Sequence, residues 1–230
     1  MDNSLMKYIL LTEKHWHINL FNELRSQFKA EWILINKKDD FTEEIISNLK
    51  PDIIFIPHWS YIISPKIFQN YECIVFHMTD LPFGRGGSPL QNLIEKGFKE
   101  TNISALKVDH GLDSGDIYLK KKLLLHGTAR EIFERASLII KGMIEDIILY
   151  KPKPKPQEGE PFFFKRRTAN ESDISNLNDI EKVYDFIRML DCEGYPSAFL
   201  ETTYFKFEFN NASLSKDNKI LLANVRIFKK

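Results

Sequence analysis

The sequence predicts an α/β fold with a Rossmann-like, mostly parallel sheet, followed by a short β-rich extension at the C-terminal end. Two observations predict it. Short apolar runs alternate with segments whose apolar residues have helical spacing, which is typical of strands and helices that alternate along a chain. A segment with Pro at every second position, residues 151–156, then separates a first part, residues 1–150, from a second part, residues 151–230.

The elements of the first part follow from these periodicities. Apolar runs predict buried strands at 8–11, 32–35, 52–57, 73–76, 103–108 and 117–125. Helical spacing predicts helices at 17–28, 41–49, 90–95 and from residue 128 onward. Thr128 and Glu131 have the spacing of a capping box at the start of the last helix. The charged run 120–122 indicates a solvent-exposed edge of the sheet.

The second part predicts a different arrangement. A helix is expected at 180–190, and two β-rich segments are expected at 198–209 and 219–228. The part between the Pro-rich segment and this helix is aromatic and basic at 162–167 and acidic toward residue 179. We therefore expect a small C-terminal subdomain after the spacer.

Composition narrows the class of protein. The 230 residues include 32 basic and 32 acidic side chains, so no global field would attract nucleic acid or an anionic membrane surface. Two cysteines are too few for a disulfide framework, which indicates a reducing compartment. No signal peptide or membrane span is recognisable. We expect a soluble cytoplasmic protein without a membrane partner. No metal site is expected either, because His15 and His17 lack acidic or thiol partners nearby.

One stretch has the plan of an active-site edge. His77 follows a predicted buried strand, at the carboxyl end where open α/β sheets place their chemistry. The dense Pro and Gly of residues 81–87 predict an irregular loop, and Ser88 and Pro89 suit the N-cap and first position of a helix. The turn at 12–17 has no glycine, which argues against nucleotide binding at the usual dinucleotide position. A structural role for His77 is the alternative interpretation.

Two motifs together resemble a known family. Residues 81–86 read Leu-Pro-Phe-Gly-Arg-Gly, directly after the strand that ends at His77, and residues 112–116 read Leu-Asp-Ser-Gly-Asp. In this order and separation they resemble the 10-formyltetrahydrofolate-dependent N-formyltransferases, and the resemblance extends loosely over residues 50–200. It implies the formyltransferase fold, with 10-formyltetrahydrofolate as co-substrate.

The resemblance also implies roles for single residues. His77 would donate to the formyl oxygen and carry the proton, and Asp113 would orient His77 and stabilise its charged form. The residues expected to bind folate are Trp59, Tyr61, Phe76, Asp109 and Gly111. The residues expected to bind the second substrate are Thr79, Arg85, Gly86, Gly87, Lys165, Arg166, Arg188 and Tyr195.

Several of these positions have a simpler interpretation that stays open. The aromatic residues at 57–63 could pack in the core, the basic run 165–167 could be plain surface, and Arg85 could anchor its loop. One position departs from the family pattern, which has Asn two residues before the His, where this chain has Val75. Val has no donor for a developing oxyanion, so either another group takes over that role or the chemistry has weakened.

The acceptor is the least constrained part of the hypothesis. Residues 188–199 resemble the C-terminal part of sugar-directed family members and, more weakly, the start of the extra domain of tRNA-directed members. We expect formylation of a UDP- or dTDP-linked 4-amino-4,6-dideoxy sugar for surface polysaccharide or glycan biosynthesis, with no nucleic-acid partner. The alternatives are a non-catalytic folate or nucleotide-sugar binding module, and a formyltransferase acting on aminoacyl-tRNA or a carrier-bound amino acid. A homodimer is one assembly that the sequence allows.

Overall fold

The computed structural model describes residues 5–230, which form two compact units. Unit 1 comprises the described residues up to Arg85, Thr101–Leu123 and Glu134–Phe163, and unit 2 comprises Gly86–Glu100, Leu124–Phe133 and Phe164–Lys230. Each unit draws on segments from both sides of residue 150. The division of the chain at residue 150 stays a prediction.

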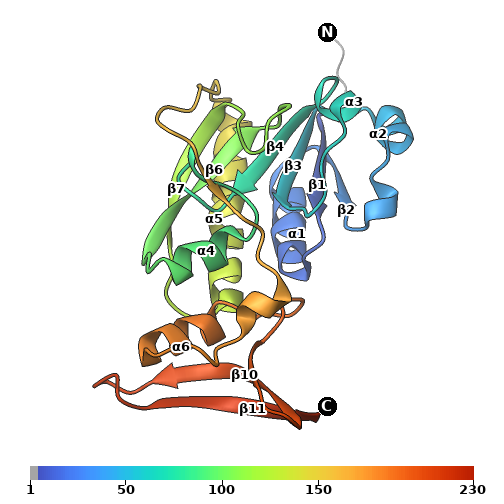
Figure 1. Cartoon of the computed structure of the whole chain (residues 1–230). Coiled ribbons are helices and arrows are strands. Elements are labelled where there is room, and N and C mark those ends of the chain that lie inside the picture. Colours follow the sequence, from blue (N-terminus) through green and yellow to red (C-terminus); the bar gives the residue numbers. More distant parts are fainter. Residues whose placement is uncertain (1–4) are drawn as a thin grey trace. The chain divides into compact units, whose positions relative to one another are not determined.

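Unit 1 is built on a six-stranded sheet with the order β2-β1-β3-β4-β6-β7 (Figure 1). The strands are β1 (Lys7–Thr12), β2 (Glu31–Ile35), β3 (Ile53–His58), β4 (Glu72–His77), β6 (Glu100–Lys107) and β7 (Ile117–Leu124). The first four pair in parallel, and β6 pairs with β4 antiparallel. The expected mostly parallel sheet is therefore confirmed, and β7 with its lysines is an edge strand as predicted.

Helices cover both faces of this sheet because its central strands are apolar on both faces. Ile46 of α2 (Glu43–Leu49) and Ile67 of α3 (Pro65–Phe68) share one buried cluster with Ile9 and Ile54 of the sheet. The helices α1 (Ile18–Gln27) and α5 (Ala129–Tyr150) pack against each other, and Lys141 pairs with Glu23 at 2.8 Å between them. Unit 1 also has two short 3₁₀ helices, η1 (His15–His17) and η2 (Lys38–Asp40), and unit 2 has a third, η3 (Ala169–Ser172).

Unit 2 carries the predicted β-rich end. An antiparallel sheet has the order β11-β10-β9, with β9 (Ala198–Glu201), β10 (Phe205–Leu214) and β11 (Leu221–Lys229). The helix α6 (Ile180–Arg188) packs on β10 and on α4 (Pro89–Glu95). The segment expected at 198–209 is thus two strands, because the chain turns between them and Thr202 N donates to Phe205 O at 2.8 Å.

Two local predictions around residues 81–89 need correction. The segment is not wholly irregular, since β5 (Phe83–Gly86) forms a two-stranded sheet with β8 (Phe162–Phe164). Ser88 does precede α4, but its φ of 51° is left-handed and its hydroxyl makes no cap hydrogen bond. The hydroxyl instead accepts from Arg167 N at 3.0 Å. The capping box before α5 is confirmed, with Thr128 N donating to Glu131 Oε2 at 2.7 Å and Glu131 N donating to Thr128 Oγ1 at 3.3 Å.

Among the described residues, no helix has the length and apolar character that crossing a bilayer requires. Among the described residues, neither Cys73 nor Cys192 forms a disulfide, and Cys73 is buried. Burial raises the pKa of the Cys73 thiol to about 12, so this thiol is protonated at neutral pH.

His17 is a buried histidine at the junction of η1 and α1. Its ring is 2% exposed, and Nδ1 lies 2.9 Å from the hydroxyl of Ser137 on α5. Burial, and to a lesser extent the nearby His58, lowers the pKa of His17 to about 3. The folded chain therefore holds this ring neutral at pH values where an unfolded chain protonates it.

This difference predicts a pH-dependent stability. Below the unfolded value of about 6.5, the unfolded state takes up a proton that the folded state does not, so the free energy of unfolding falls as pH falls. His17→Gln removes this titrating group. The fall in the free energy of unfolding between pH 6.5 and 5 should therefore be smaller by about 2 kcal/mol in the variant than in wild type. Urea unfolding at several pH values measures it, with the exposed His126→Gln as matched control. Equal pH slopes for His17→Gln and wild type would contradict the assignment.

Candidate active site

His77 stands at the carboxyl end of β4, where its ring is 7% exposed. Nε2 lies 2.8 Å from the backbone oxygen of Gly84. A carbonyl oxygen can only accept, so Nε2 carries a proton and donates it to Gly84. In the neutral ring the remaining nitrogen, Nδ1, then has a free lone pair. The backbone thus selects which nitrogen of His77 can accept a proton.

Asp113 faces that second nitrogen. Its Oδ2 lies 3.7 Å from Nδ1 of His77, and the carboxylate is largely buried. The separation exceeds a hydrogen bond but lies within the range of an ion pair. A proton gained at Nδ1 would therefore meet a negative charge at once, which suits an imidazole that takes up and returns protons. The sequence motifs predicted these two residues, and the structure brings their side chains together.

The Gly84 carbonyl is the meeting point of a small buried network. Thr79 is fully buried, and its Oγ1 donates to Gly84 O at 3.3 Å. Ser104 Oγ donates to Thr79 O at 2.7 Å and so holds the strand end in place. The single hydroxyl proton of Thr79 is directed at Gly84, while its predicted contact with substrate stays a prediction.

Val75, two residues before His77, is a half-buried apolar residue packed against the sheet's core cluster. The same cluster contacts Trp59, whose ring packs edge-on against Phe41 at 5.7 Å and Tyr61 at 5.3 Å. The indole N–H of Trp59 is buried and has no hydrogen-bond partner among the described residues. A flat apolar surface with one unpaired donor fits the ring system of a folate.

The other residues predicted to bind folate have defined structural contacts. Phe76 is 4% exposed within β4. Asp109 Oδ1 accepts from Gly111 N at 2.9 Å and from Ser114 Oγ at 2.7 Å, which braces the loop that carries Asp113. A Cβ at Gly111 would collide with Ser114 Oγ, so a larger residue here would displace the hydroxyl that donates to Asp109.

Arg85 is linked to the loop that carries Asp113 through Gln157, a residue that the motifs did not predict. Its Nε and Nη2 donate to Oε1 of Gln157 at 3.2 and 2.8 Å. Nε2 of Gln157 donates to the backbone oxygens of Asp113 and Gly115 at 2.8 and 2.9 Å. The interpretation of Arg85 as an anchor of its loop is thus supported. Gln157 follows the Pro-rich segment and belongs to no motif, so no sequence signal pointed to it.

The remaining predicted residues belong to unit 2. Gly86 and Gly87 allow close approach of the chain at Phe164 and Arg166, since a Cβ on either glycine would collide there. Lys165 and Arg166 are exposed. The neighbouring Arg167 instead pairs with Glu95, donates to Glu171 O and lies 5.3 Å from the ring of Phe186.

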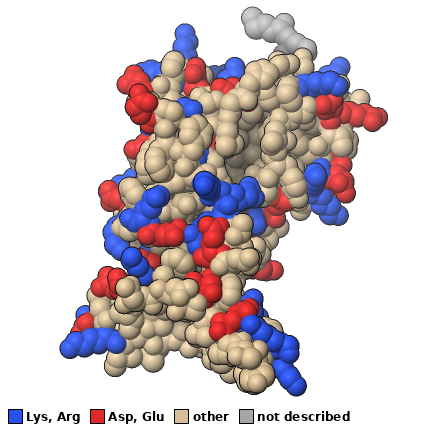
Figure 2. Space-filling view, viewed as in Figure 1, with Lys and Arg blue, Asp and Glu red and all other residues tan. Residues whose placement is uncertain are grey.

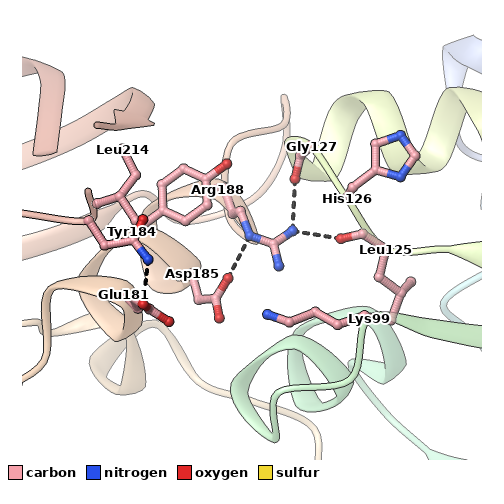
Figure 3. A pocket seen from close by; sticks show the side chains of 10 residues that line it. Lys99, Leu125, His126, Gly127, Glu181, Tyr184, Asp185, Arg188 and Leu214 are labelled. Atoms are coloured by element: carbon pink, nitrogen blue, oxygen red, sulfur yellow. Dashed lines mark hydrogen bonds and ion pairs between the residues drawn. The ribbon is translucent and has the colours of Figure 1, made fainter. Parts of the chain in front are cut away.

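Arg188 is buried in unit 2 beside a pocket of about 250 Å³ (Figure 3). Its Nε donates to Asp185 at 2.6 Å, and Nη1 donates to the backbone oxygens of Leu125 and Gly127 at 2.7 and 2.9 Å. These contacts tie α6 to the segment before α5. The pocket is lined by Lys99, Leu125, His126, Gly127, Glu181, Tyr184, Asp185, Arg188, Leu214 and Asn218.

Tyr195, also predicted to bind substrate, stacks on Phe133 with ring centroids 5.3 Å apart. Burial raises the pKa of its hydroxyl, which is therefore neutral at physiological pH. The stacking supplies apolar contact within unit 2.

The fold and site define an α/β transferase-like domain with an imidazole–carboxylate pair at a strand end. Comparison with known proteins identifies the family. Residues 23–136 match the model described as formyl transferase, and residues 169–228 match the model described as methionyl-tRNA formyltransferase, C-terminal domain. A solved methionyl-tRNA formyltransferase from Clostridium thermocellum is 49% identical, covers 98% of this chain and 100% of its own, and has a TM-score of 0.95. The chain belongs to the formyltransferase family, which uses 10-formyltetrahydrofolate.

Two further relatives define the limits of this likeness. The methionyl-tRNA formyltransferase of Francisella philomiragia is 32% identical over 169 residues, 71% of this chain and 54% of that protein. The chain spans about half the length of the curated relatives that it matches. The formyltransferase PseJ from Anoxybacillus kamchatkensis, solved with a UDP-linked formamido sugar and tetrahydrofolate, is 23% identical with a TM-score of 0.56 and covers 83% of this chain and 94% of its own. That likeness shows the fold alone.

These findings correct the sequence-based choice of acceptor. The relatives at 32% and 49% identity are named for a tRNA substrate, whereas the sugar-directed PseJ matches at 23%. The expectation of a nucleotide-sugar formyltransferase is therefore wrong, and so is the expectation of a protein without a nucleic-acid partner. The nucleotide-linked sugar was the second substrate expected at Lys165, Arg166, Arg188 and Tyr195, so that substrate no longer supports their assignment.

The contacts of Arg188 predict a structural effect on substitution. Arg188→Met keeps the volume but leaves Asp185 and two backbone oxygens without their donor, which should lower the free energy of unfolding by about 3 kcal/mol. Urea unfolding measures it, with Lys182→Met on the exposed side of the same helix as control. If Arg188→Met is as stable as that control, the guanidinium is not what joins α6 to the segment before α5.

Proposed function

We propose that this chain transfers a formyl group from 10-formyltetrahydrofolate to the α-amino group of methionyl-tRNA. The observation that carries the choice of acceptor is the 49% identity, over 98% of the chain, to a protein of that name. The match of residues 169–228 to the C-terminal domain model of the same enzymes supports it. The geometry of His77 and Asp113 supports the chemistry.

The site residues have separable tasks in this reaction. Trp59, with its unpaired indole N–H, and Tyr61 would hold 10-formyltetrahydrofolate, which supplies the formyl group when bound. The acceptor amine must lose a proton as its nitrogen bonds to the formyl carbon. Nδ1 of His77 takes that proton, because Nε2 is already committed to Gly84 O. Asp113, 3.7 Å away, stabilises the charged ring until the proton passes to N10 of the folate, whose bond to the formyl carbon breaks as tetrahydrofolate leaves.

Val75 supplies no donor to negative charge on the formyl oxygen. After proton uptake, Nδ1–H of His77 is a donor that the site itself provides, and a positioned donor of this kind can lower the barrier by several kcal/mol. This accounts for a working site without the Asn of the family pattern.

Binding of tRNA by this chain would require local attraction between basic side chains and RNA phosphates, because the chain as a whole carries no net charge. The formal net charge is zero, and Figure 2 shows basic and acidic side chains interspersed over the visible face. Contacts with the phosphate backbone would therefore depend on where basic side chains lie close together and not on the net charge of the chain.

The direct test follows formyl transfer to the amino acid. The protein is incubated with 10-formyltetrahydrofolate and methionyl-tRNA, and N-formylmethionine is measured after the ester is hydrolysed. Free methionine and uncharged tRNA serve as controls. Formyl transfer to methionyl-tRNA alone supports the proposal, and absence of transfer from a folded, folate-binding protein contradicts it.

His77→Ala should lower the rate of this transfer by about 10²- to 10⁴-fold, the usual contribution of a positioned acid–base group. Folate binding should remain, because the ring's two neighbours, Gly84 O and Asp113, belong to segments that other contacts hold. The exposed His126→Ala is the matched control and should retain the wild-type rate. A His77→Ala protein with the control's rate would remove His77 from the proton transfer.

A further inference from the structure

We propose that Gln157 is a positioning residue of the formyl-transfer site, which holds both neighbours of His77 at once. The inference rests on the proposed function for its kinetic consequence, but its structural basis stands independently. Gln157 lies in unit 1, is half-buried, and directly follows the Pro-rich segment.

The side-chain amide of Gln157 is fully occupied. An amide oxygen offers two acceptor positions and an amide nitrogen offers two donors. Arg85 fills both acceptor positions, and the backbone oxygens of Asp113 and Gly115 take both donors. The orientation of the amide is unambiguous, because a flipped amide would place NH₂ against the guanidinium and oxygen against two carbonyls.

These contacts reach His77 from two sides. Arg85 is bonded in the chain to Gly84, whose oxygen accepts from Nε2 of His77. Asp113, whose main chain accepts from Gln157, presents its carboxylate to Nδ1 of the same ring. A single side chain therefore links the segment that fixes one nitrogen of His77 with the loop that supplies the charge beside the other.

Asp113 needs such support. Its φ of 49° lies in the left-handed region, which is unfavourable for a residue other than glycine and persists where neighbouring contacts enforce it. Two residues later, Gly115 packs so closely on Lys107 O that a Cβ would collide there. Bonds from Gln157 to both residues fix the loop's turn and with it the direction of the Asp113 carboxylate.

Gln157 is itself held by backbone contacts. Lys155, two residues earlier, pairs with Ile117 of β7 through two hydrogen bonds of 2.7 and 2.9 Å. The Pro residues at 152, 154 and 156 limit the conformations of this segment further. The Pro-rich segment therefore positions Gln157 at the site with little loss of conformational entropy. This segment does more than separate two parts of the chain.

The central variant is Gln157→Met, which has similar length and removes all four hydrogen bonds. We expect kcat for formyl transfer to fall by about 10- to 100-fold with KM for both substrates changed less than about twofold, because geometry at the reacting group is lost while binding surfaces remain. Gln27→Met, at an exposed position on α1, is the matched control and should keep the wild-type kcat.

A double variant separates positioning from general destabilisation. In a His77→Ala background, Gln157→Met should cause no further loss of rate, because the residue acts through His77 and its neighbours. A rate loss that is equal in both backgrounds would overturn the proposal, since it would mean that Gln157 only maintains the fold.

Gln157→Glu tests the two donated bonds separately. The carboxylate keeps acceptors for Arg85 but cannot donate to Asp113 O and Gly115 O. The kcat should fall at least as far as in Gln157→Met. A wild-type kcat in the Glu variant would overturn the assignment of the loop contacts.

Amide hydrogen exchange provides a readout that is independent of the acceptor. Exchange at the amides of Lys107 and Gly111, which donate to Asp116 O and Asp109 Oδ1 around this loop, should accelerate by at least about tenfold in Gln157→Met and remain unchanged in Gln27→Met. If methionyl-tRNA is not the acceptor, this measurement still decides whether Gln157 holds the loop. Unchanged exchange in Gln157→Met would overturn the proposal whatever the substrate.

Discussion

The hydrogen bond from Nε2 of His77 to the backbone oxygen of Gly84 is the constraint on which the rest of the site depends. It fixes the ring's tautomer and leaves Nδ1 beside Asp113 as the nitrogen that can exchange a proton. Gly84, the second residue of β5, adopts a φ of 80°, a left-handed conformation natural to glycine. The Gly-rich stretch after β4 therefore orients the ring of His77 and is not merely a flexible connection.

The central sheet, the strand end and the pair His77–Asp113 could be predicted from the sequence because each has a local signature. Apolar runs mark buried strands, and the two Gly-containing motifs mark the two loops. The Gly84 carbonyl and Gln157 could not be predicted in this way. A backbone oxygen has no signature in side chains, and Gln157 meets Asp113 only through contacts between segments 44 residues apart. The pairing of β5 with β8 and the structural contacts of Arg188 escaped prediction for the same reason.

The predicted acceptor, a nucleotide-linked amino sugar, was wrong because the motifs that identify the family do not identify the amine. The two motifs resemble the family as a whole, which includes members with different acceptors, so they carry little information on the amine. Overall identity separates the two acceptors better, since it is 49% to a protein named methionyl-tRNA formyltransferase and 23% to the sugar-directed PseJ. Balanced overall charge was an equally weak guide, because recognition can rest on a few local contacts.

The central claim, that Gly84 holds His77 with its proton on Nε2, can be measured directly by two-bond ¹H–¹⁵N correlation NMR on protein labelled at histidine. The account predicts that the neutral ring of His77 has a protonated Nε2 and an unprotonated Nδ1, with chemical shifts of a single tautomer. A neutral His77 protonated at Nδ1, or a ring that averages between the two tautomers, would contradict the account.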